Sequence, residues 1–565
     1  MPALAFSAFL LLYIYSTAVT TRPILHISRY LYRELSGHHL QVMLNIGIGT
    51  TLVLLDLAMV WATKTTVDIA THQSTFTTLP RALALLALIM ALRLVLGLSM
   101  RWIRAILGVK ALNTMQRYIF GRLLRGRWET LRRFHTGNLT NRLEQDVRDV
   151  VNFTTESIPL FVTTFLQFLG AFLFLFFMDR TLAVIVVLVV PFFILSSKLY
   201  VKRMRRLTHQ ARDLDSSIQS IIQETLQHAL VIKTLQRVAA TLQGLTVRQH
   251  ELHRCILKRT RYSTISSTLL NLGFATGYFV TFTWGTLSLQ QGLISYGAFI
   301  AFIQLVGQIQ EPVRNLSRFI PIFINAFTAA ERLMDLEEIP QEDAGRDVQL
   351  TGPVAIEVSQ LDFAYDKGER TIFHHFSHTF PAGSVTAILG ETGSGKTTLI
   401  RLLLALTHPT GGSITLIDGE GQRHKTAAHL RTNFCYVPQG NTLFSGTIRT
   451  NLLMGNPEAT EAQMQQALRD ACADFVFRHP KGLDAPCSEA GGGLSEGQAQ
   501  RIAIARALLN TGCILIFDEA TSALDAETER KVLQNIARAR QHQTMLFITH
   551  RPEVMRYASH QLHIE

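Results

Sequence analysis

Residues 390–397, which read GETGSGKT, decide the fold of the C-terminal half of the chain. They follow an apolar segment typical of a buried strand, 384–389, and precede the apolar run LIRLLLAL, typical of a helix. A glycine-rich loop between a strand and a helix turns backbone N–H groups toward phosphate oxygens, and the helix N-terminus adds a favourable dipole. The sequence therefore predicts a nucleotide phosphate site, in which Lys396 reaches the β and γ phosphates and Thr397 ligates Mg²⁺.

A second chemical signal lies at the end of another apolar run, CILIF at 513–517, which is typical of a buried strand. The next residues are Asp518 and Glu519. Beside a phosphate loop, Asp518 is expected to hold Mg²⁺ through water, and Glu519 to orient and polarise the attacking water. Alone, such a pair could cap a helix. Together with the phosphate loop, it favours nucleotide hydrolysis.

The composition divides the chain into two parts of different solvent class. The 565 residues are 48% hydrophobic and only 17% charged, but the long apolar runs are confined to roughly the first 330 residues. Six runs are long enough to cross a membrane as helices, which takes about 20 apolar residues each. These runs are 42–62, 82–107, 158–178, 182–200, 264–289 and 296–320. The remainder is typical of a soluble α/β domain.

The net charge of +12 is concentrated between the apolar runs. One cluster comprises Arg117, Arg122, Arg125, Arg127, Arg132 and Arg133, and the other Lys202, Arg203, Arg205, Arg206, Arg254, Lys258, Arg259 and Arg261. This is the pattern of cytoplasmic loops, which carry an excess of Lys and Arg. It therefore favours an oriented multi-pass membrane protein, and we expect no nucleic-acid partner.

The domain boundaries follow from polar stretches. Residues 1–23 form an apolar extension, either an extra N-terminal span or an upstream addition, and 24–33 predict an amphipathic interfacial helix. The transmembrane domain extends over 24–336. A linker containing Pro340 and Gly345 covers 337–352, and the nucleotide-binding domain covers 353–565.

The run LSEGQ at 494–498 resembles LSGGQ, the signature of ATP-binding cassette (ABC) proteins. Other motifs of that family stand in the same order: YVPQG resembles the Q-loop, SALD the D-loop and ITHR the switch histidine. The resemblance implies ATP and Mg²⁺ as ligands. It implies nucleotide contacts from Tyr365, Gly390, Thr392, Gly393, Ser394, Gly395, Lys396, Thr397, Thr398, Ser495, Gly497, Gln498 and Asp525. It implies Mg²⁺ ligands in Thr397, Gln439 and Asp518, and catalytic roles for Glu519, His550 and Gln439.

The membrane half carries the resemblance further. Residues 134–147, FHTGNLTNRLEQDV, look like the first intracellular loop of type IV ABC exporters, and 311–320 and 329–338 resemble the end of their sixth helix. The implied fold is an all-α polytopic membrane domain of six core helices, followed by an α/β P-loop ATPase domain. Short coupling helices, for which 131–137 and 223–227 are candidates, would contact the ATPase domain.

Such a chain is a half-transporter, and two copies would sandwich two ATP molecules between the signature of one chain and the P-loop of the other. A homodimer is expected, because this chain carries both halves of the composite site. Glu496 departs from the family, since it places a negative side chain where the signature has glycine.

The leading functional hypothesis is ATP-driven export or flipping by alternating access. The alternatives are an ATP-gated regulator or channel, and an importer built on the exporter fold. Glu519 and His550 favour turnover over gating. The expected location is the bacterial inner membrane, with the ATPase domain cytoplasmic and lipids as neighbours. The phenylalanines of 158–178 suit either an amphipathic substrate or packing against lipid, so the substrate stays open.

Two charges stand inside apolar runs: Asp56 in LVLLDLAMV and Arg93 in IMALRLVLG. At about 1.5 Å per helical residue, both lie ~21 Å from the cytoplasmic ends of their spans. A lone charge at that depth is costly, which predicts either an ion pair or separate contacts with a water-filled cavity. The alternative is that Arg93 snorkels and Asp56 is hydrated.

Overall fold

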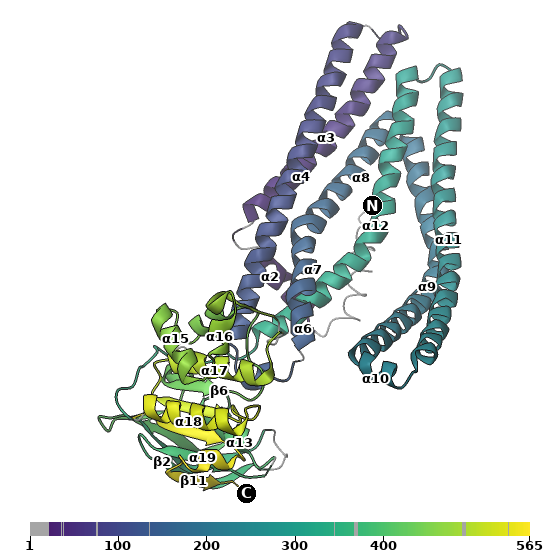
Figure 1. Cartoon of the computed structure of the whole chain (residues 1–565). Helices are drawn as coiled ribbons and strands as arrows, with labels where there is room; N and C mark the ends of the chain where they lie inside the picture. The colour runs from purple at the N-terminus through teal and green to yellow at the C-terminus, as the bar shows by residue number, and fades with distance from the viewer. Residues whose placement is uncertain are drawn as a thin grey trace. The chain divides into compact units, whose positions relative to one another are not determined.

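The computed structural model describes residues 22–564 except 35, 36, 38, 75, 76, 135, 344, 366–370, 392, 489–492 and 541 (Figure 1). The chain divides into two compact units. The helical unit contains Met1–Phe120 and Gly137–Glu337, and the α/β unit contains Gly121–Thr136 and Glu338–Glu565. The apolar extension at 3–20 lies outside the described residues.

Each of the six predicted apolar runs lies within one long helix. These helices are α3 (His39–Ala70), α4 (Leu79–Leu124), α8 (Ile158–Met178), α9 (Arg180–Gln227), α11 (Val238–Gln290) and α12 (Tyr296–Glu337). By length and apolar composition, three helical stretches among the described residues could cross a membrane: His39–Ala70, Leu79–Leu124 and Gly137–Met178. The last contains α6 (Thr136–Asn141), α7 (Val147–Asn152) and two π-helical turns, η1 (Arg142–Asp146) and η2 (Phe153–Ser157).

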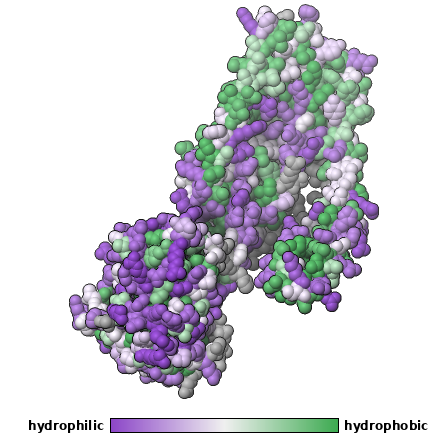
Figure 2. Space-filling model, viewed as in Figure 1, coloured by the Kyte–Doolittle hydropathy of each residue, from purple (hydrophilic) through white to green (hydrophobic). Residues whose placement is uncertain are grey.

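The core of the helical unit lies where α8, α9 and α12 meet, around buried Leu175, Leu182 and Leu305. Glycines allow close helix contacts there, as membrane helices require: a Cβ added at Gly285 would lie 2.6 Å from the Phe299 ring. Apolar side chains cover much of the outer surface of this unit (Figure 2).

The phenylalanines of the third run mostly fill helix contacts. Phe161 packs edge-to-face against Phe319 and Phe323 of α12, with ring centroids 5.5 and 5.7 Å apart. Phe172 is buried, whereas Phe177 is 82% exposed. The phenylalanines of this run therefore serve mainly to pack helices against one another, and not to line a substrate surface.

The predicted interfacial helix is α2 (Ile24–Glu34), which buries Ile27, Tyr30 and Leu31. Its polar side chains bind the end of α12. The Arg33 guanidinium lies 2.5 Å from a Glu337 carboxylate oxygen, and the Tyr30 hydroxyl donates to the other at 3.1 Å. A helix is thus confirmed at this position, and it is anchored to the last turn of α12; its place at a membrane interface stays a prediction.

Helices α9 and α11 lie side by side (Figure 1). A short helix, α10 (Ala229–Thr234), joins the C-terminal end of α9 to the N-terminal end of α11. The candidate coupling helix at 223–227 was misplaced, because those residues continue α9 without a break. The chain turns at His228, where φ is −106° and ψ is 24°. The sequence hides this turn, since neither Gly nor Pro marks it.

The α/β unit holds two main sheets. The first is antiparallel in the order β2-β1-β4-β5, formed by β1 (Ala355–Phe363), β2 (Phe373–Phe380), β4 (Gly411–Ile417) and β5 (Arg423–Lys425). The second is parallel in the order β11-β3-β10-β9-β6. Its strands are β3 (Val385–Leu389), β6 (Phe434–Val437), β9 (Ile514–Asp518), β10 (Thr544–Ile548) and β11 (His560–His563). The predicted strands at 384–389 and 513–517 correspond to β3 and β9.

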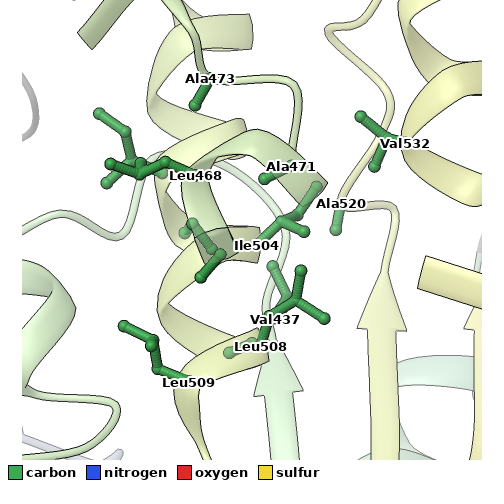
Figure 3. Close-up of a cluster of buried hydrophobic side chains, with 14 of the residues drawn as sticks. Val437, Leu468, Ala471, Ala473, Ile504, Leu508, Leu509, Ala520 and Val532 are labelled. Carbon is green, nitrogen blue, oxygen red and sulfur yellow. The ribbon is translucent and has the colours of Figure 1, made fainter. Parts of the chain in front are cut away.

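The larger core of this unit packs helices against the parallel sheet (Figure 3). Val437 on β6 and Ile504 on α17 (Glu496–Leu509) are buried together with Leu468 on α15 (Glu461–Asp470) and Val532 on α18 (Ala526–Ala539). This packing fixes the helices that begin at the signature and D-loop motifs.

Residues 121–136 belong to the α/β unit although they stand between two apolar runs. The Arg127 N–H donates to the Pro340 carbonyl and the Glu342 N–H to the Arg125 carbonyl, both at 2.9 Å. The short helix of this segment is α5 (Trp128–Leu131), earlier than the predicted 131–137, and its Glu129 accepts the His408 N–H at 2.8 Å.

Asp56 and Arg93 form the predicted ion pair, with Arg93 Nε 2.5 Å from Asp56 Oδ1. We expect the single variants Asp56→Arg and Arg93→Asp to lose expression and transport, because an unpaired charge in a span costs about 2.5–3.5 kcal/mol. The double variant with both changes restores the pair and should recover both measurements. A double variant no better than either single one would contradict direct pairing. Asp56→Asn with Arg93→Gln is the neutral control.

Candidate nucleotide-binding and hydrolysis site

Three neighbouring parallel strands bring the predicted chemical groups to one edge of the sheet. β10 lies between β3 and β9, with Ile548 opposite Ile388 on one side and Asp518 on the other. The chain leaves β3 for the glycine loop, β10 for His550, and β9 for Glu519. The carboxyl ends of parallel strands are where open α/β sheets bind ligands.

The glycine loop has backbone conformations and space that only glycine permits. Gly390, Gly393 and Gly395 have φ angles of 152°, 90° and 102°. An added Cβ at Gly390 would lie 2.3 Å from the Ile564 carbonyl oxygen, and at Gly395 2.7 Å from Ile372. At Gly393 it would meet no heavy atom within 4 Å, so there the φ angle and not the space favours glycine.

Polar groups of this loop fit a phosphate. Ser394 has a buried hydroxyl oxygen without a hydrogen-bond partner. The buried Lys396 ammonium donates to the carbonyls of Gly390 and Glu391 at 2.5 and 2.7 Å, which holds it across the loop. Lys396 begins α13 (Lys396–Leu403), and Thr397 beside it is exposed. Thr392 lies outside the described residues.

Tyr365 is held near the loop by its hydroxyl. This oxygen shares a hydrogen bond with the buried Thr398 hydroxyl at 3.1 Å and accepts one from Arg401 at 2.8 Å. The Arg132 guanidinium lies 5.0 Å from the centre of the ring. Thr398 therefore positions Tyr365, and a cation from the segment 121–136 lies against the aromatic surface.

Asp518 is buried at the end of β9 and accepts a hydrogen bond from the Tyr436 hydroxyl at 3.1 Å. Burial raises the pKa of Asp518, and the neighbouring Glu519 charge raises it further. A cation beside this carboxylate would offset both effects. Oxygen ligands of this kind suit Mg²⁺, so the residues present fit that ion.

The three predicted catalytic side chains lie together. Gln439 donates to Glu519 Oε2 at 2.7 Å, and His550 Nε2 lies 4.0 Å from Glu519 Oε1. Glu519 has a left-handed backbone, with φ of 49°, and its N–H donates to the Ile548 carbonyl at 3.0 Å. Such a conformation is unusual for a non-glycine residue and is typical of functional positions.

The signature and D-loop motifs begin two helices. Ser495 caps α17: its hydroxyl accepts the Gln498 N–H at 3.2 Å, and the Gln498 side chain accepts the Ser495 N–H at 3.0 Å. Gly497 is required, because an added Cβ would lie 2.8 Å from the Ala523 carbonyl oxygen. Asp525 caps α18 by accepting the Thr528 N–H at 2.9 Å.

Glu496 is exposed at the first position of α17, where a negative charge is favourable. Among the described residues, the Ser495 side chain hydrogen-bonds to Gln498 and the Ser495 carbonyl accepts the Ala499 N–H at 2.9 Å, and no bond joins Ser495 to the glycine loop of its own chain. Ser495 and Glu496 of the signature thus lie exposed at a helix N-terminus, and Ser495 makes no hydrogen bond to the described residues of the phosphate loop.

Four polar residues missed in the sequence join the motifs. Tyr436 binds Asp518, and Arg401 binds Tyr365. Gln500 of α17 donates to the Ser522 hydroxyl at 3.2 Å, and Arg551 donates to the Leu524 carbonyl at 3.1 Å. Proximity to a recognised motif was the only available signal, because the partners are remote in sequence.

Comparisons with known proteins agree with this geometry. Residues 43–313 match the family described as ABC transporter transmembrane region, and 373–522 match ABC transporter. An ATP-dependent lipid A-core flippase of Bordetella avium (strain 197N) is 32% identical over 77% of this chain and 74% of that protein. This chain belongs to the ABC transporters. Members of this family couple ATP hydrolysis to transport across a membrane.

Two further comparisons describe the same ABC transporter architecture. The uncharacterized ABC transporter ATP-binding protein YfiC of Bacillus subtilis (strain 168) is 31% identical over 74% of this chain and 69% of that protein. A bacterial Atm1-family ABC exporter with ATP bound has the same fold, with a TM-score of 0.74 over 95% of this chain and 94% of that chain, at 23% identity. None of these three is named as a gated channel or an importer.

Removing the ring of Tyr365 should weaken ATP binding more than removing its hydroxyl. Stacking of a base on an aromatic ring is worth about 1–3 kcal/mol, so we expect Tyr365→Ala to bind ATP roughly 5- to 150-fold more weakly. Tyr365→Phe keeps the ring and should stay near the wild-type affinity. Equilibrium titration with ATP measures both. Equal loss in the two variants would assign the effect to the hydroxyl contacts with Thr398 and Arg401.

Proposed function

We propose that two copies of this chain form a homodimer in the bacterial inner membrane and flip or export an amphipathic lipid, with MgATP in two composite sites. The observation that carries the proposal is the cluster of Gln439, Glu519 and His550 at the strand ends beside the glycine loop. A carboxylate that is held by an amide and lies close to an imidazole can orient a water molecule and accept its proton.

ATP binding exchanges contacts within this site. Lys396 would leave the carbonyls of Gly390 and Glu391 for the β and γ phosphates, and Ser394 would gain the partner that its buried oxygen lacks. Thr397, Gln439 and Asp518 would hold Mg²⁺, which neutralises phosphate charge when bound. The loop therefore suits a bound phosphate, because the Lys396 ammonium bonds to backbone carbonyls of the loop itself and can exchange them for phosphate oxygens.

Hydrolysis then depends on freeing Glu519. In this structure its Oε2 atom is taken by the Gln439 amide. If Gln439 turns to Mg²⁺, that oxygen becomes available to orient the attacking water and accept its proton. His550, 4.0 Å from the other oxygen, can donate a hydrogen bond to the γ-phosphate.

Two features support pairing of chains. First, Ser495 of the signature caps α17 and is exposed. The N-terminus of this helix is therefore accessible to a phosphate bound to another chain. The tip around α10 exposes Leu226, Leu230 and Leu235 by 71%, 77% and 64%. An exposed apolar cluster of this kind indicates a protein contact, which we assign to the α/β unit of the partner.

The substrate class and the location rest on the relatives. Several of the similar proteins are named ATP-dependent lipid A-core flippases, all of them bacterial. An amphipathic glycolipid as substrate agrees with the many apolar residues on the visible face of the helical unit and with an ionic pair, Asp56–Arg93, inside the spans (Figure 2). We further assign the ATPase unit to the cytoplasm, on the side of the basic loops.

Glu519→Gln should trap the ATP-bound dimer. The change keeps the shape of the side chain and removes the charge that polarises water, so hydrolysis should fall by at least about 100-fold, the size of a general-base contribution. ATP affinity should persist because Lys396, Thr397 and Asp518 are untouched. Phosphate release and ATP retention in detergent-free discs measure the two properties. Hydrolysis at the wild-type rate would remove Glu519 from the mechanism.

The chain alone should suffice for activity. It carries both the P-loop with Glu519 and the signature with Ser495, so the purified protein in lipid nanodiscs should hydrolyse ATP without a second gene product. Addition of lipid A-core glycolipid should raise the rate. ATP binding without hydrolysis, restored only by a different half-transporter, would contradict the homodimer. Hydrolysis that the glycolipid leaves unchanged would contradict the substrate class alone.

A further inference from the structure

Two histidines and one carboxylate converge on the surface of the antiparallel sheet, at the ends of β1 and β2. His374 Nδ1 lies 3.2 Å from Asp362 Oδ1, and His375 Nδ1 lies 3.3 Å from Asp362 Oδ2. One potential ligand atom from each residue lies within 4.8 Å of the others. Neither the phosphate site nor the catalytic cluster uses these side chains.

The backbone of β2 is distorted in a way that brings the two histidines together. Consecutive residues of a regular strand point to opposite faces of the sheet. Here His375 has a left-handed φ of 48°, and the β1–β2 register shifts between Leu361 and Phe363. The two imidazole rings consequently lie side by side, with centroids 4.3 Å apart and both Nδ1 atoms toward Asp362.

The carboxylate is fixed independently of the imidazoles. The His375 backbone N–H donates to Asp362 Oδ1 at 2.8 Å. Gly411 of the neighbouring strand β4 leaves room for the other oxygen, since a Cβ there would lie 2.9 Å from Asp362 Oδ2. Thr410 donates its N–H to the Asp362 carbonyl at 2.9 Å. The acceptor group is thus pre-positioned, while both histidine rings are more than half exposed and free to adjust.

We propose that Asp362, His374 and His375 bind a divalent transition-metal ion such as Ni²⁺, Zn²⁺ or Cu²⁺. Ligand atoms of a tetrahedral ion with bonds of about 2.0–2.1 Å are roughly 3.3 Å apart. Each imidazole nitrogen lies at about that distance from one of the two Asp362 oxygens, and small turns of the exposed rings can bring both nitrogens to one ion. Two imidazole nitrogens and one carboxylate oxygen suit these ions and disfavour Ca²⁺ and Mg²⁺. Water or a further donor completes the coordination, because the site is open on its exposed side.

A metal ion here ties β1 to β2 just before the chain reaches Tyr365. Asp362 and Tyr365 are separated by Phe363 and Ala364, and the Ile372 N–H donates to the Phe363 carbonyl at 2.8 Å. Binding to the folded state alone raises stability by mass action. Occupancy should therefore stabilise the strand pair that positions the aromatic ring, and the site is distinct from the phosphate loop.

Isothermal titration with Ni²⁺ tests the site on the full-length protein in nanodiscs, purified through a tag without histidine. The wild type should show one binding equivalent that weakens at least about tenfold in His374→Ala and in His375→Ala, since each removes a ligand. Asp362→Asn should weaken it too while keeping an acceptor for the His375 N–H. Ni²⁺ should also raise the unfolding temperature of the wild type, but not of these variants.

His424→Ala is the matched control. His424 Nε2 lies 3.0 Å from Asp418 Oδ2, so it is also a histidine paired with an aspartate on this sheet, but without a second imidazole. This variant should keep the binding equivalent. The proposal is wrong if the wild type shows no such equivalent, or if His424→Ala weakens it as much as His374→Ala does. Electron paramagnetic resonance with Cu²⁺ supplies an independent count, with two nitrogen ligands expected in the wild type and one in each histidine variant.

Discussion

The parallel pairing of β3, β10 and β9 is the constraint on which the site depends. Parallel strands place their carboxyl ends at one edge, so the glycine loop, His550 and Glu519 meet there although they span about a third of the chain. The strands themselves are buried on both faces, and helices such as α17 and α18 cover them. A register slip would move Asp518 out of line with Ile548 and Ile388, which would separate the acid from the phosphate loop.

The α/β unit includes a segment that the sequence assigns to the membrane half. Residues 121–136 pair through main-chain bonds with the region that follows α12, and Glu342 there also binds Arg431 at 2.6 Å. Arg132 of this segment lies against the Tyr365 ring. The chain thus passes through the α/β unit between α4 and α6, and this passage is held there by main-chain hydrogen bonds.

Sequence reasoning succeeded where the signal was local. The glycine loop, the acids after CILIF and the apolar runs are each recognisable within about 20 residues. The helix rise placed Asp56 and Arg93 at a similar depth, and the ion pair that the structure contains is one of the arrangements left open by that argument. Sequence reasoning failed where contacts between residues remote in sequence determine where a helix ends or which unit a segment belongs to. The turn at His228 has no breaker residue, and the segment 121–136 changes unit through bonds to residues two hundred positions away. Tyr436 and Arg551 lie within recognised motifs, but their partners Asp518 and Leu524 are remote in sequence, so only the fold reveals these contacts.

The central claim is that each ATP site is shared between two chains, and the ATPase activity of mixed dimers tests it most directly. Lys396→Ala disables the phosphate loop and Ser495→Arg the signature, so each variant alone should be inactive. Co-expressed together, they should recover about a quarter of the wild-type activity, because half of randomly formed two-fold dimers contain one intact composite site. If the mixture stays as inactive as either variant alone while mixed dimers are recovered by tandem purification, the sites are not shared in this way.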